Sequence, residues 1–584
     1  MEELLKYTSK FSQYDFPIIM FLFKSFIILF IIISIILFIY DRFIQRENQL
    51  LINYPLIGRL RYIFYALRDP MRQYFGDENF YDSFDKVKWV DNAANNKSPY
   101  TSFSPSQPIN RSRITLKNVN CVLNTEDVSK EFSVTFGEKI KVPYITKSLI
   151  GRSAMSDGAI SPEGTRAFSK ASFMGNFPIN TGEGGLTSNF LYTHKYDAEN
   201  RKYLDVKEGT FFAKFIYKIV KFILNKSVAQ NVYKHMVIYT KDYETYLFDE
   251  DKLICYRINW NSSIENFPKT VPNDVPDIIF QIGSGLYGVR DKKGSFDEER
   301  YKKVMSFSKM TEIKMAQGAK QTGGKLLANK VSEAIAYYRG VPVHQDLFSP
   351  NQFPYAKTLE ELFDFIGKLK NLSNKPVGVK IIISSKSAFE QYSNLIKKRI
   401  DENSDAYPDF ITIDGTDGGS GAAPLEMMMS VGMSITKALF IADTTLRSLG
   451  IRNKVRLIAS EKVLTPDDAI ILLGLGADFV SIARAFMMSA GCIRARECSG
   501  ANGRHCPVGL ATQDKNKRAS FLVEKKAVTI TSYHNQLING MHQLLAIMGL
   551  KSIKDINKNN LTFKDHKGKT YTNIDKYFKD TLID

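Results

Sequence analysis

Four glycine-rich segments combine polar side chains with a backbone that can approach a ligand closely. Each follows a short apolar run, and in chain order they are Asn180–Gly185, Gly283–Gly285, Gln317–Lys325 and Asp414–Gly421. Glycine has no Cβ, so such loops let main-chain groups lie against a flat or anionic molecule. One such loop would be an ordinary tight turn, but four together predict a ligand site. Gly283–Gly288 also fits G-x-G-x-x-G, but no helix start and no suitably spaced acidic residue follow it, so a dinucleotide-binding turn is not expected.

Two lysines interrupt apolar runs, where an ammonium group is costly unless it meets an anion. Lys314 lies in EIKMAQ and Lys380 lies in VGVKII. Because burial of an unpaired charge is unfavourable, each needs a core carboxylate or an anionic ligand, such as the electron-rich end of a reduced flavin. Both alternatives stay open. In the second, Lys320 and Arg339 would join Lys314 as clamps for a dicarboxylate, with Gln317 at the end of the same run.

Three cysteines near the end of the apolar runs form a candidate metal or cluster site. Cys492, Cys498 and Cys506 have the spacing C-x5-C-x7-C, and His505 precedes the last of them. Such a set could hold an iron–sulfur cluster or zinc. The remaining two cysteines are isolated, and five cysteines in 584 residues exclude a disulfide scaffold.

The candidate residues lie at the ends of apolar runs that predict the strands of one sheet. The runs are nearly continuously apolar, which is typical of parallel strands buried on both faces. Eight are present: Leu149–Met155, Phe177–Gly182, Asp277–Ser284, Met310–Gln317, Val377–Ile383, Asp409–Gly415, Val455–Glu461 and Asp478–Arg484. Helical candidates between them are Val331–Arg339, Leu359–Leu369, Phe389–Glu402, Ile435–Leu449 and Pro466–Leu475. The order predicts an α/β fold, a (β/α)8 TIM barrel, with a doubly wound open sheet as the alternative.

In such a barrel, the active site lies at the carboxyl ends of the strands. The seventh and eighth runs end in Ser460 and in Ala483–Arg484. A hydroxyl, main-chain N–H groups and an arginine after these two strands suit a phosphate. The sequence therefore predicts a site for flavin mononucleotide (FMN) or for a phosphorylated substrate.

The N-terminal end has the character of a membrane anchor. Phe16–Tyr40 is 25 residues long and carries one charge, Lys24. It is long enough to span a bilayer, and no small-residue cleavage site follows it, which disfavours a cleaved signal peptide. The C-terminal flank is rich in arginine, at positions Arg42, Arg46, Arg59, Arg61, Arg68 and Arg72. The positive-inside rule then predicts a single-pass membrane protein with everything after Tyr40 in the cytoplasm.

Composition and one long connection narrow the remaining possibilities. The net charge is +18, but the basic residues are spread along the chain, so a solvated surface is expected and no nucleic-acid interface. Asn189–Asp274 is too long for a simple crossover and predicts an insertion after the second strand. It contains Phe215–Lys226, an apolar helix with lysines at its polar positions, which either packs within the insertion or contacts a membrane or a partner. We expect Glu524–Gly549 to be helical and the tail after Lys551 to be peripheral.

Six motifs resemble those of the FMN-binding synthase domain of glutamate synthase. They are SAMSDGAIS, NTGEGG, FQIGSGLYGVR, EIKMAQGAK, IDGTDGGSGAAP and CPVGLATQD, in the family's order between Gly151 and Asp514. The segment NYPLIGRLRYIF, at Asn53–Phe64, resembles the membrane-attached branch of that family. The resemblance implies a (β/α)8 barrel that reduces 2-iminoglutarate, made from 2-oxoglutarate and ammonia, to L-glutamate with a hydride from reduced FMN.

The resemblance also implies roles for individual residues. Lys314, Lys320 and Arg339 would bind the substrate carboxylates, and Glu183 would lie at the entrance for ammonia. Complete enzymes of the family hold a [3Fe-4S] cluster, which implies Cys492, Cys498 and Cys506 as its ligands. The FMN-binding set would be Met155, Ser156, Gln281, Lys380, Asp414, Gly415, Gly418 and Gly419, with Ser460, Ala483 and Arg484 in the loops after the last two strands.

The chain departs from the family pattern at three places. Complete bacterial enzymes begin with a glutamine amidotransferase whose nucleophile is an N-terminal cysteine, but the first cysteine here is Cys121. Lys325 stands where the family's loop usually reads GGQ. The family's cysteine spacing is C-x5-C-x4-C, so three residues are inserted before Cys506. The sequence shows no second nucleotide-binding domain, so a ferredoxin or a separate reductase subunit is implied as electron donor.

The predicted organisation is therefore an anchored barrel with one insertion. The parts are an anchor with its flanks (1–45), a juxtamembrane and linker segment (46–148), a barrel (149–530) with its insertion (189–274), and a C-terminal helix and tail (531–584). The predicted activity is that of a glutamate synthase-like oxidoreductase acting on CH–NH2 donors. The alternatives are an FMN enzyme for another keto or imino substrate, which Lys325 and the insertion suggest, and a catalytically silent, membrane-tethered flavoprotein.

Overall fold

The structure is a computed structural model, and it divides into two compact units, Met1–Asn79 and Phe80–Asp584. It describes residues 23–75, 84–98, 113–187, 189–191, 203–239, 246–258, 271, 275–291, 293–317, 324–331, 335–336, 339–416, 418, 427, 430–495, 497–500, 505–564 and 569–581.

The second unit is built around a closed barrel of parallel strands, as the sequence predicts. Among the described residues, eight strands form the barrel in chain order, and the last pairs with the first. They are β4 (Ile150–Arg152), β5 (Ile179–Asn180), β9 (Ile278–Ile282), β10 (Met310–Lys314), β13 (Val377–Ile381), β14 (Phe410–Asp414), β15 (Arg456–Ser460) and β16 (Phe479–Ile482). Each lies within one of the eight apolar runs. The closure of the sheet excludes the doubly wound alternative.

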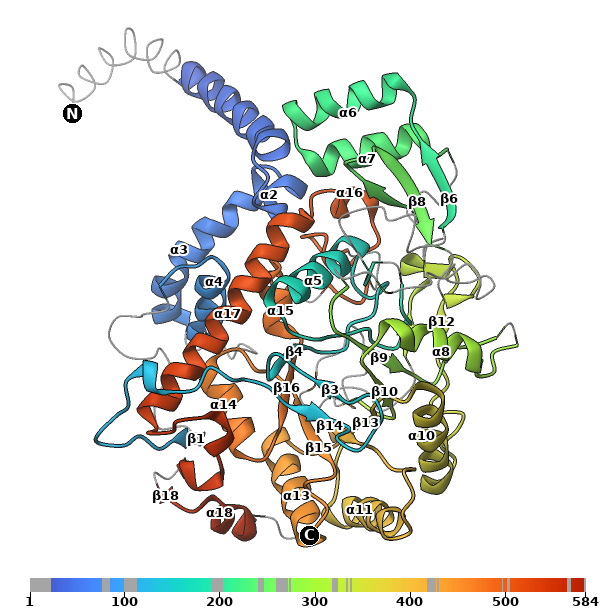
Figure 1. Cartoon of the computed structure of the whole chain (residues 1–584). Coiled ribbons are helices and arrows are strands. Elements are labelled where there is room, and N and C mark those ends of the chain that lie inside the picture. The colour runs from blue at the N-terminus through green and yellow to red at the C-terminus, as the bar shows by residue number, and fades with distance from the viewer. Residues whose placement is uncertain are drawn as a thin grey trace, which may run out of the picture. The chain divides into compact units, whose positions relative to one another are not determined.

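Helices surround the strands (Figure 1). Those after successive strands are α5 (Pro162–Gly175), α8 (Glu298–Phe307), α10 (Leu359–Ser373), α11 (Lys386–Asp401), α13 (Ile435–Ser448), α14 (Pro466–Gly474) and α15 (Arg484–Ser489). Local sequence sets where they begin: Ser161 caps α5 with its side chain, Thr358 caps α10, and Thr465 with Asp468 forms a capping box on α14. Of the predicted helix Val331–Arg339, only Ile335, Ala336 and Arg339 are described as helical.

The amino-terminal end of the barrel is closed by an aromatic plug. A short hairpin of β2 (Thr135–Phe136) and β3 (Tyr144–Ile145) places the fully buried Phe136 against the strands. Its ring meets Phe410 edge-on at 5.5 Å and Phe479 at 6.1 Å between centroids. This end of the barrel is therefore filled with apolar side chains, and the polar residues lie at the opposite end, which we call the mouth.

The insertion after β5 folds into a small layer of its own. It contains β6 (Tyr203–Glu208), α6 (Phe211–Ile223), α7 (Lys226–Val237), β7 (Leu247–Asp249) and β8 (Ile254–Ile258). The three strands form an antiparallel sheet in the order β6-β8-β7. The buried residues Tyr217, Tyr233 and Cys255 form a core beneath the two helices. One face of α6 therefore packs within the insertion, as one of the two interpretations of its sequence requires.

The C-terminal part consists of a long helix and a tail that contains strands and a final helix. The long helix α17 (Val523–Ile547) packs along α5 and α4 (Phe84–Ala94). After it, β17 (Leu561–Lys564) pairs with both β18 (Thr570–Tyr571) and β1 (Arg113–Leu116). The final helix α18 (Ile574–Thr581) buries Ile574 and Phe578. Apolar residues spaced among the lysines and asparagines account for this ordered tail.

The first unit contains a helix that could cross a membrane by its length and composition. This helix, Phe23–Ile44, has a mean hydropathy of 2.7 and none of its most apolar stretch is buried in the structure. A signal sequence near the N-terminus would have the same properties. Nε of Arg59, in α3 (Ile57–Phe75), donates to Asp41 at 2.9 Å. In the sequence, α2 (Gln49–Asn53) separates the two residues. The predicted span starts earlier, at Phe16, and its first residues lie outside the described part.

Candidate active site

The carboxyl ends of neighbouring strands bring several of the predicted residues together at the barrel mouth. Register pairs Lys314 on β10 with Lys380 on β13, and Asp414 on β14 with Ser460 on β15. Gln281 is the penultimate residue of β9 and lies beside Glu312 of β10. The mouth therefore carries two ammonium groups, a carboxylate, a hydroxyl and a carboxamide from five adjacent strands.

Lys314 pairs with a carboxylate of the loop that follows β5. Its Nζ lies 3.0 Å from Oε2 of Glu183, and the two side chains are 12% and 21% exposed. The carboxylate fits closely against two glycines: a Cβ added to Gly283 would lie 2.7 Å from Cβ of Glu183, and one added to Gly324 would overlap Oε1. Three of the four glycine-rich segments thus converge on Glu183, and their glycines make room for it.

Lys380 is also paired within the chain. Its Nζ lies 3.5 Å from Oδ2 of Asp414, and both side chains are buried. It donates to Oγ of Ser460 at 3.5 Å, and Ser460 in turn lies 3.3 Å from Oγ of Ser153 on the neighbouring loop after β4. Lys380 therefore meets a core carboxylate, as one of the two alternatives requires, whereas the carboxylate that pairs with Lys314 is a partly exposed loop residue.

Arg339 lies against the same loop as Glu183. Its guanidinium donates to the main-chain oxygen of Asp157 at 3.0 Å and stacks over the Tyr287 ring at 5.2 Å from the centroid. A Cβ on Gly184 would lie 2.6 Å from its NH2. Burial lowers the pKa of Arg339, and the nearby Tyr287 and Glu183 oppose this shift. No hydrogen-bond partner for its buried Nε is found among the described residues.

Glu312 organises the interior of the barrel just below the mouth, and the sequence analysis missed it. Its Oε1 accepts from Nδ2 of Asn180 at 2.8 Å and from Nε2 of Gln281 at 2.7 Å, and its Oε2 accepts from Oγ1 of Thr412 at 2.5 Å. Four strands are therefore joined through one buried carboxylate. The signal was present, because Glu312 stands two residues before Lys314 in an apolar run, and alternate residues of a strand share a face.

Arg152 is a second buried charge that the sequence analysis missed. The side chain, on β4, is fully buried and lies over the rings of Phe168 and Phe190. Its NH1 donates to the main-chain oxygens of Met155 at 3.0 Å and of Asn180 at 2.8 Å. Burial lowers its pKa to about 9. Arg152 therefore fixes the loop that carries Met155 and Ser156 relative to the loop that carries Glu183.

The remaining predicted residues are placed only in part. Ser156 lies against Gly182, whose added Cβ would be 2.6 Å from the Ser156 main-chain nitrogen. A Cβ on Gly418 would lie 2.6 Å from Oδ2 of Asp414, and one on Gly415 would lie 2.7 Å from Oε2 of Glu461. Gln317 and Lys325 are described, whereas Lys320 and Gly419 lie outside the described residues. Ala483 and Arg484 begin α15 directly after β16.

The three cysteines of the C-x5-C-x7-C motif lie in one region without forming a metal-binding group in the described part of the chain. Cys506 is buried, and burial raises the pKa of the Cys492 thiol to about 12. The buried Lys330 donates to the main-chain oxygens of Cys498 and of Ala159, the latter at 3.1 Å. Burial lowers the pKa of Lys330 to about 8. The cysteine loop is thus held against the loop after β4 by a buried ammonium group.

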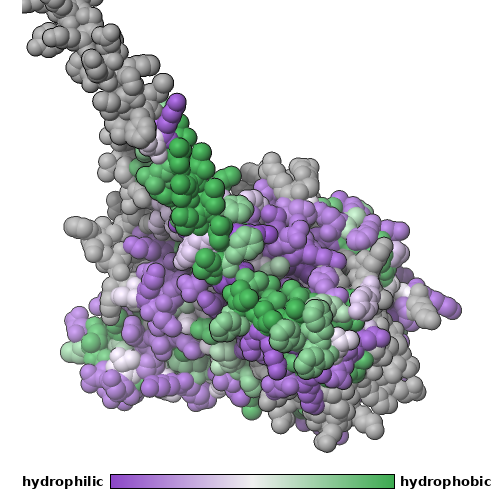
Figure 2. Space-filling view, turned by 90° about the horizontal axis from the view of Figure 1, so that it is seen from above, coloured by the Kyte–Doolittle hydropathy of each residue, from purple (hydrophilic) through white to green (hydrophobic). Residues whose placement is uncertain are grey.

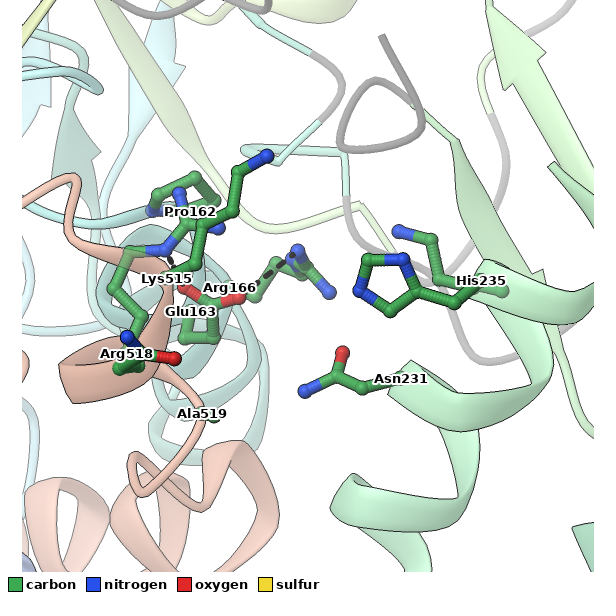
Figure 3. A pocket seen from close by; sticks show the side chains of 10 residues that line it. Pro162, Glu163, Arg166, Asn231, His235, Lys515, Arg518 and Ala519 are labelled. Carbon is green, nitrogen blue, oxygen red and sulfur yellow. Dashed lines mark ion pairs between the residues drawn. The ribbon is translucent and has the colours of Figure 1, made fainter. Parts of the chain in front are cut away.

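A separate cavity of about 150 Å³ lies between the barrel and the insertion (Figure 3). Its centre is Glu163, on α5, whose carboxylate meets Arg518 at 3.3 Å and Arg166 at 3.8 Å. Asn231, Lys234 and His235 line it from α7. Burial would raise the pKa of Glu163, but the two arginines outweigh it and hold that pKa below its usual value. The Glu163 cluster thus ties α5 to α16 (Lys515–Arg518), and the insertion contributes lining residues from α7.

Comparison with known proteins identifies the family of the chain. A family model described as a conserved region in glutamate synthase matches residues 84–551. A glutamate synthase large subunit-like protein of Bacillus subtilis, YerD, is 30% identical over 91% of this chain and 92% of its own length. An archaeal-type NADPH glutamate synthase of Thermotoga maritima is 30% identical over 51% of this chain and 55% of its own.

Solved structures that align with most of the chain are more distant. The flavin-binding domain of baker's yeast flavocytochrome b2 has a TM-score of 0.38 and 13% identity, and covers 86% of this chain and 82% of its own. A mandelate oxidase has a TM-score of 0.35 and 11% identity, with coverages of 82% and 90%. The extent of the family match, together with the relative that spans both chains, is decisive: the chain belongs to the glutamate synthase family.

Proposed function

We propose that the protein is an FMN-dependent, glutamate synthase-like oxidoreductase that reduces 2-iminoglutarate, formed from 2-oxoglutarate and ammonia, to L-glutamate. The observation that carries the proposal is the Lys314–Glu183 pair at the barrel mouth, with Arg339 on the far side of the same loop. Two cationic side chains beside one carboxylate suit a dicarboxylate and an amine-forming step. The family membership of the chain supports this assignment.

The residues present fit FMN by the chemistry of their donors. Lys380, Ser460 and Gln281 come from the strands β13, β15 and β9 of the same barrel and offer an ammonium, a hydroxyl and a carboxamide. In this proposal they hold the flavin together with Met155 and Ser156, with Asp414 and Gly415, and with Gly418 and Gly419 of the same loop. Ser460, Ala483 and Arg484 would face the phosphate. The flavin supplies the hydride.

The chain's own residues bind the substrate and deliver a proton. Condensation of 2-oxoglutarate with ammonia releases water, and the imine then takes a hydride at carbon and a proton at nitrogen. Lys314, Lys320 and Arg339 bind the two carboxylates through charge-assisted hydrogen bonds, with Gln317 beside them. Glu183 receives the incoming ammonium ion and passes the proton of that ion to the imine nitrogen. It can do so because its carboxylate and the Lys314 ammonium group lie within hydrogen-bond reach of the same position.

A different keto or imino substrate is the second candidate. Lys325 and the insertion 189–274 were the reasons to consider it, but the Lys325 side chain stands over the Phe348 ring at 4.9 Å and lies 3.9 Å from Asp346. A local role for Lys325 accounts for its departure from the family pattern, which favours the 2-oxoglutarate assignment. The third candidate is a catalytically silent, membrane-tethered flavoprotein. Turnover in an activity assay would exclude it.

Electron supply, cluster and location complete the proposal. A ferredoxin or a separate reductase subunit delivers the electrons. The candidate ligands of a [3Fe-4S] cluster are Cys492, Cys498 and Cys506. Iron analysis of the purified protein tests whether the cluster is present. No reaction step is assigned to that cluster, since the described residues form no metal-binding group. The anchor within residues 1–45 would hold the barrel, residues 149–530, on the cytoplasmic side, with segment 46–148 and the tail 531–584 around it.

The deciding experiment uses the full chain purified in detergent. A visible flavin spectrum and the mass of the released cofactor identify FMN. After photoreduction of the flavin without oxygen, 2-oxoglutarate with ammonium should reoxidise it and yield glutamate, whereas pyruvate with ammonium should not. A colourless protein contradicts the FMN assignment, and reoxidation by pyruvate alone favours the second candidate.

A further inference from the structure

Helix α6 presents large apolar side chains to solvent. Phe222 is 92% exposed and Phe211 is 87% exposed, and Phe215 is 51% exposed between them. These three phenylalanines recur at intervals of four and seven residues, so they lie along one stripe of the helix. Phe212, at 62%, and Ile223, at 68%, lie beside this stripe. We call these five residues the outer face of α6.

The outer face is not the side on which α6 packs. Ala213 and Tyr217 point into the core of the insertion, where Tyr217 meets Tyr233 edge-on at 5.8 Å. The helix is therefore apolar on two sides, one covered and one bare. Helix α6 lies at the top of Figure 1. Figure 2 views the molecule from above and shows a hydrophobic patch among hydrophilic side chains on that face. A contiguous exposed apolar patch of this kind marks a contact surface.

The charges around the outer face indicate what covers it. Helix α6 carries Lys214, Lys218 and Lys221 and no acidic residue. Lys214 pairs with Glu208, and Glu250 pairs with both Lys221 and Lys226, so the lysines around α6 outnumber the carboxylates that they meet. By helical geometry these lysines flank the apolar stripe on one side, and Lys226 follows at the start of α7. An apolar stripe bordered by lysines is the pattern of a helix that lies in the plane of an anionic bilayer surface. The long lysine stems can lie along the apolar side chains while their ammonium groups reach the headgroups.

We propose that α6 lies in the headgroup region of an anionic bilayer, with its outer face turned toward the acyl chains. The helix would be a second membrane contact, in addition to the candidate span Phe23–Ile44. A membrane-spanning helix in the same chain would keep the insertion close to the bilayer. The effective concentration of lipid at α6 would then be high, so a single short helix would be enough to bind the surface. The occupant is a lipid surface, since a lysine-bordered stripe matches anionic headgroups above an apolar layer.

The test places a tryptophan on the outer face of the full-length protein. Phe222→Trp changes a side chain that is almost wholly exposed, so it leaves the packing intact. The protein is reconstituted into vesicles of phosphatidylcholine with 30–40% phosphatidylglycerol, about the anionic content that attracts such helices, and a fraction of lipid carries a doxyl quencher on the acyl chain. We expect the added fluorescence, after subtraction of the wild-type signal, to be quenched by half or more.

The matched control is Ile145→Trp, on the β2–β3 hairpin that closes the amino-terminal end of the barrel. Ile145 is 61% exposed. Its added fluorescence should be quenched less than half as strongly. Equal quenching at the two positions overturns the proposal. Protection of the tryptophan in Phe222→Trp from aqueous iodide, without quenching by lipid, overturns it as well and assigns the face to a protein partner or a second copy. In vesicles of phosphatidylcholine alone, quenching in Phe222→Trp should fall at least twofold; unchanged quenching removes the anionic lipid from the assignment.

Discussion

Oε2 of Glu183 lies 3.0 Å from Nζ of Lys314, and this side chain lies against two glycines, Gly283 and Gly324, where a Cβ would collide with it. The pair is partly exposed at the barrel mouth, so both groups remain within reach of a small polar substrate. Under the proposed function, a substrate carboxylate would replace Glu183 as the partner of the ammonium group, which a fully buried ion pair would not allow.

Lys314→Met should abolish most activity while the fold and the flavin are retained. The methionine keeps the length of the side chain, and Glu183 is 21% exposed, so water can solvate it when the ammonium is lost. Loss of one charged contact to a carboxylate costs about 2–4 kcal/mol in transition-state binding, which is roughly a 30- to 900-fold loss in kcat/KM. Ammonia-dependent oxidation of the reduced flavin by 2-oxoglutarate measures the effect.

The matched control for that variant is Lys325→Met, because Lys325 lies in a surface hairpin against Phe348 and is 41% exposed. It should keep activity within about threefold, as expected of a surface contact. If Lys314→Met instead loses its flavin or unfolds, Lys314 has a structural role. Normal turnover in Lys314→Met would contradict its role in substrate binding.

Gly324→Ala should displace Glu183 and lower activity. A Cβ at this position would overlap Oε1 of Glu183, so the carboxylate or the loop must move. Ammonia-dependent turnover is expected to fall at least tenfold, about 1.4 kcal/mol, with the flavin spectrum unchanged. The cause is checked in a Glu183→Ala background, where Gly324→Ala should have little further effect on either turnover or melting temperature. Additive losses in the double variant would place the clash elsewhere.

The barrel could be predicted from the sequence because its signal is local. Each strand is a short run such as Phe410–Asp414, in which every residue is buried, and parallel strands buried on both faces have this composition. The order of strands and helices then leaves few ways to connect them. The strands of the tail could not be predicted in this way, because β17 pairs with β1, which lies far away in the sequence.

The partners at the site could not be predicted, because they are distant along the chain. The sequence showed that Lys314 needs an anion, but the anion belongs to Glu183, 131 residues away, on a loop whose path depends on the folded barrel. Glu312 was missed for a different reason. A carboxylate in an apolar run was as visible as the lysine two residues later, and its three hydrogen-bond donors come from three other strands.

Glu163→Gln should destabilise the fold by about 3–5 kcal/mol, the usual cost of breaking a buried ion pair. The carboxylate meets both Arg518 and Arg166, and its removal leaves two guanidinium groups with less compensation at the junction of barrel and insertion. The midpoint of urea unfolding measures the loss. Lys302→Gln is the control, because its i,i+3 pair with Glu299 is exposed and should contribute less than about 1 kcal/mol. Equal effects of the two substitutions would contradict a structural role for the cluster.

His534 should make the protein lose stability in mild acid. The imidazole is buried on α17, its Nε2 lies 2.9 Å from Oγ of Ser148, and its ring lies 4.6 Å from that of Phe177 between centroids. Burial lowers its pKa from 6.5 to about 4. The folded pKa is below the unfolded one, so the unfolded state takes up the proton first as the pH falls, and stability is lost between pH 6.5 and pH 4. Two and a half pH units correspond to about 3 kcal/mol.

The variant His534→Gln isolates this contribution, because glutamine can still bond to Ser148 but does not titrate in this range. The variant should be less stable than the wild type at pH 7, where the imidazole packs without charge, and the difference should shrink by about 3 kcal/mol on going to pH 4. Urea unfolding of the full-length protein at several pH values measures it. His344→Gln, at an exposed position, should run parallel to the wild type over the same range. A His534→Gln curve that also stays parallel to the wild type would mean that the buried imidazole is not the group whose protonation destabilises the fold.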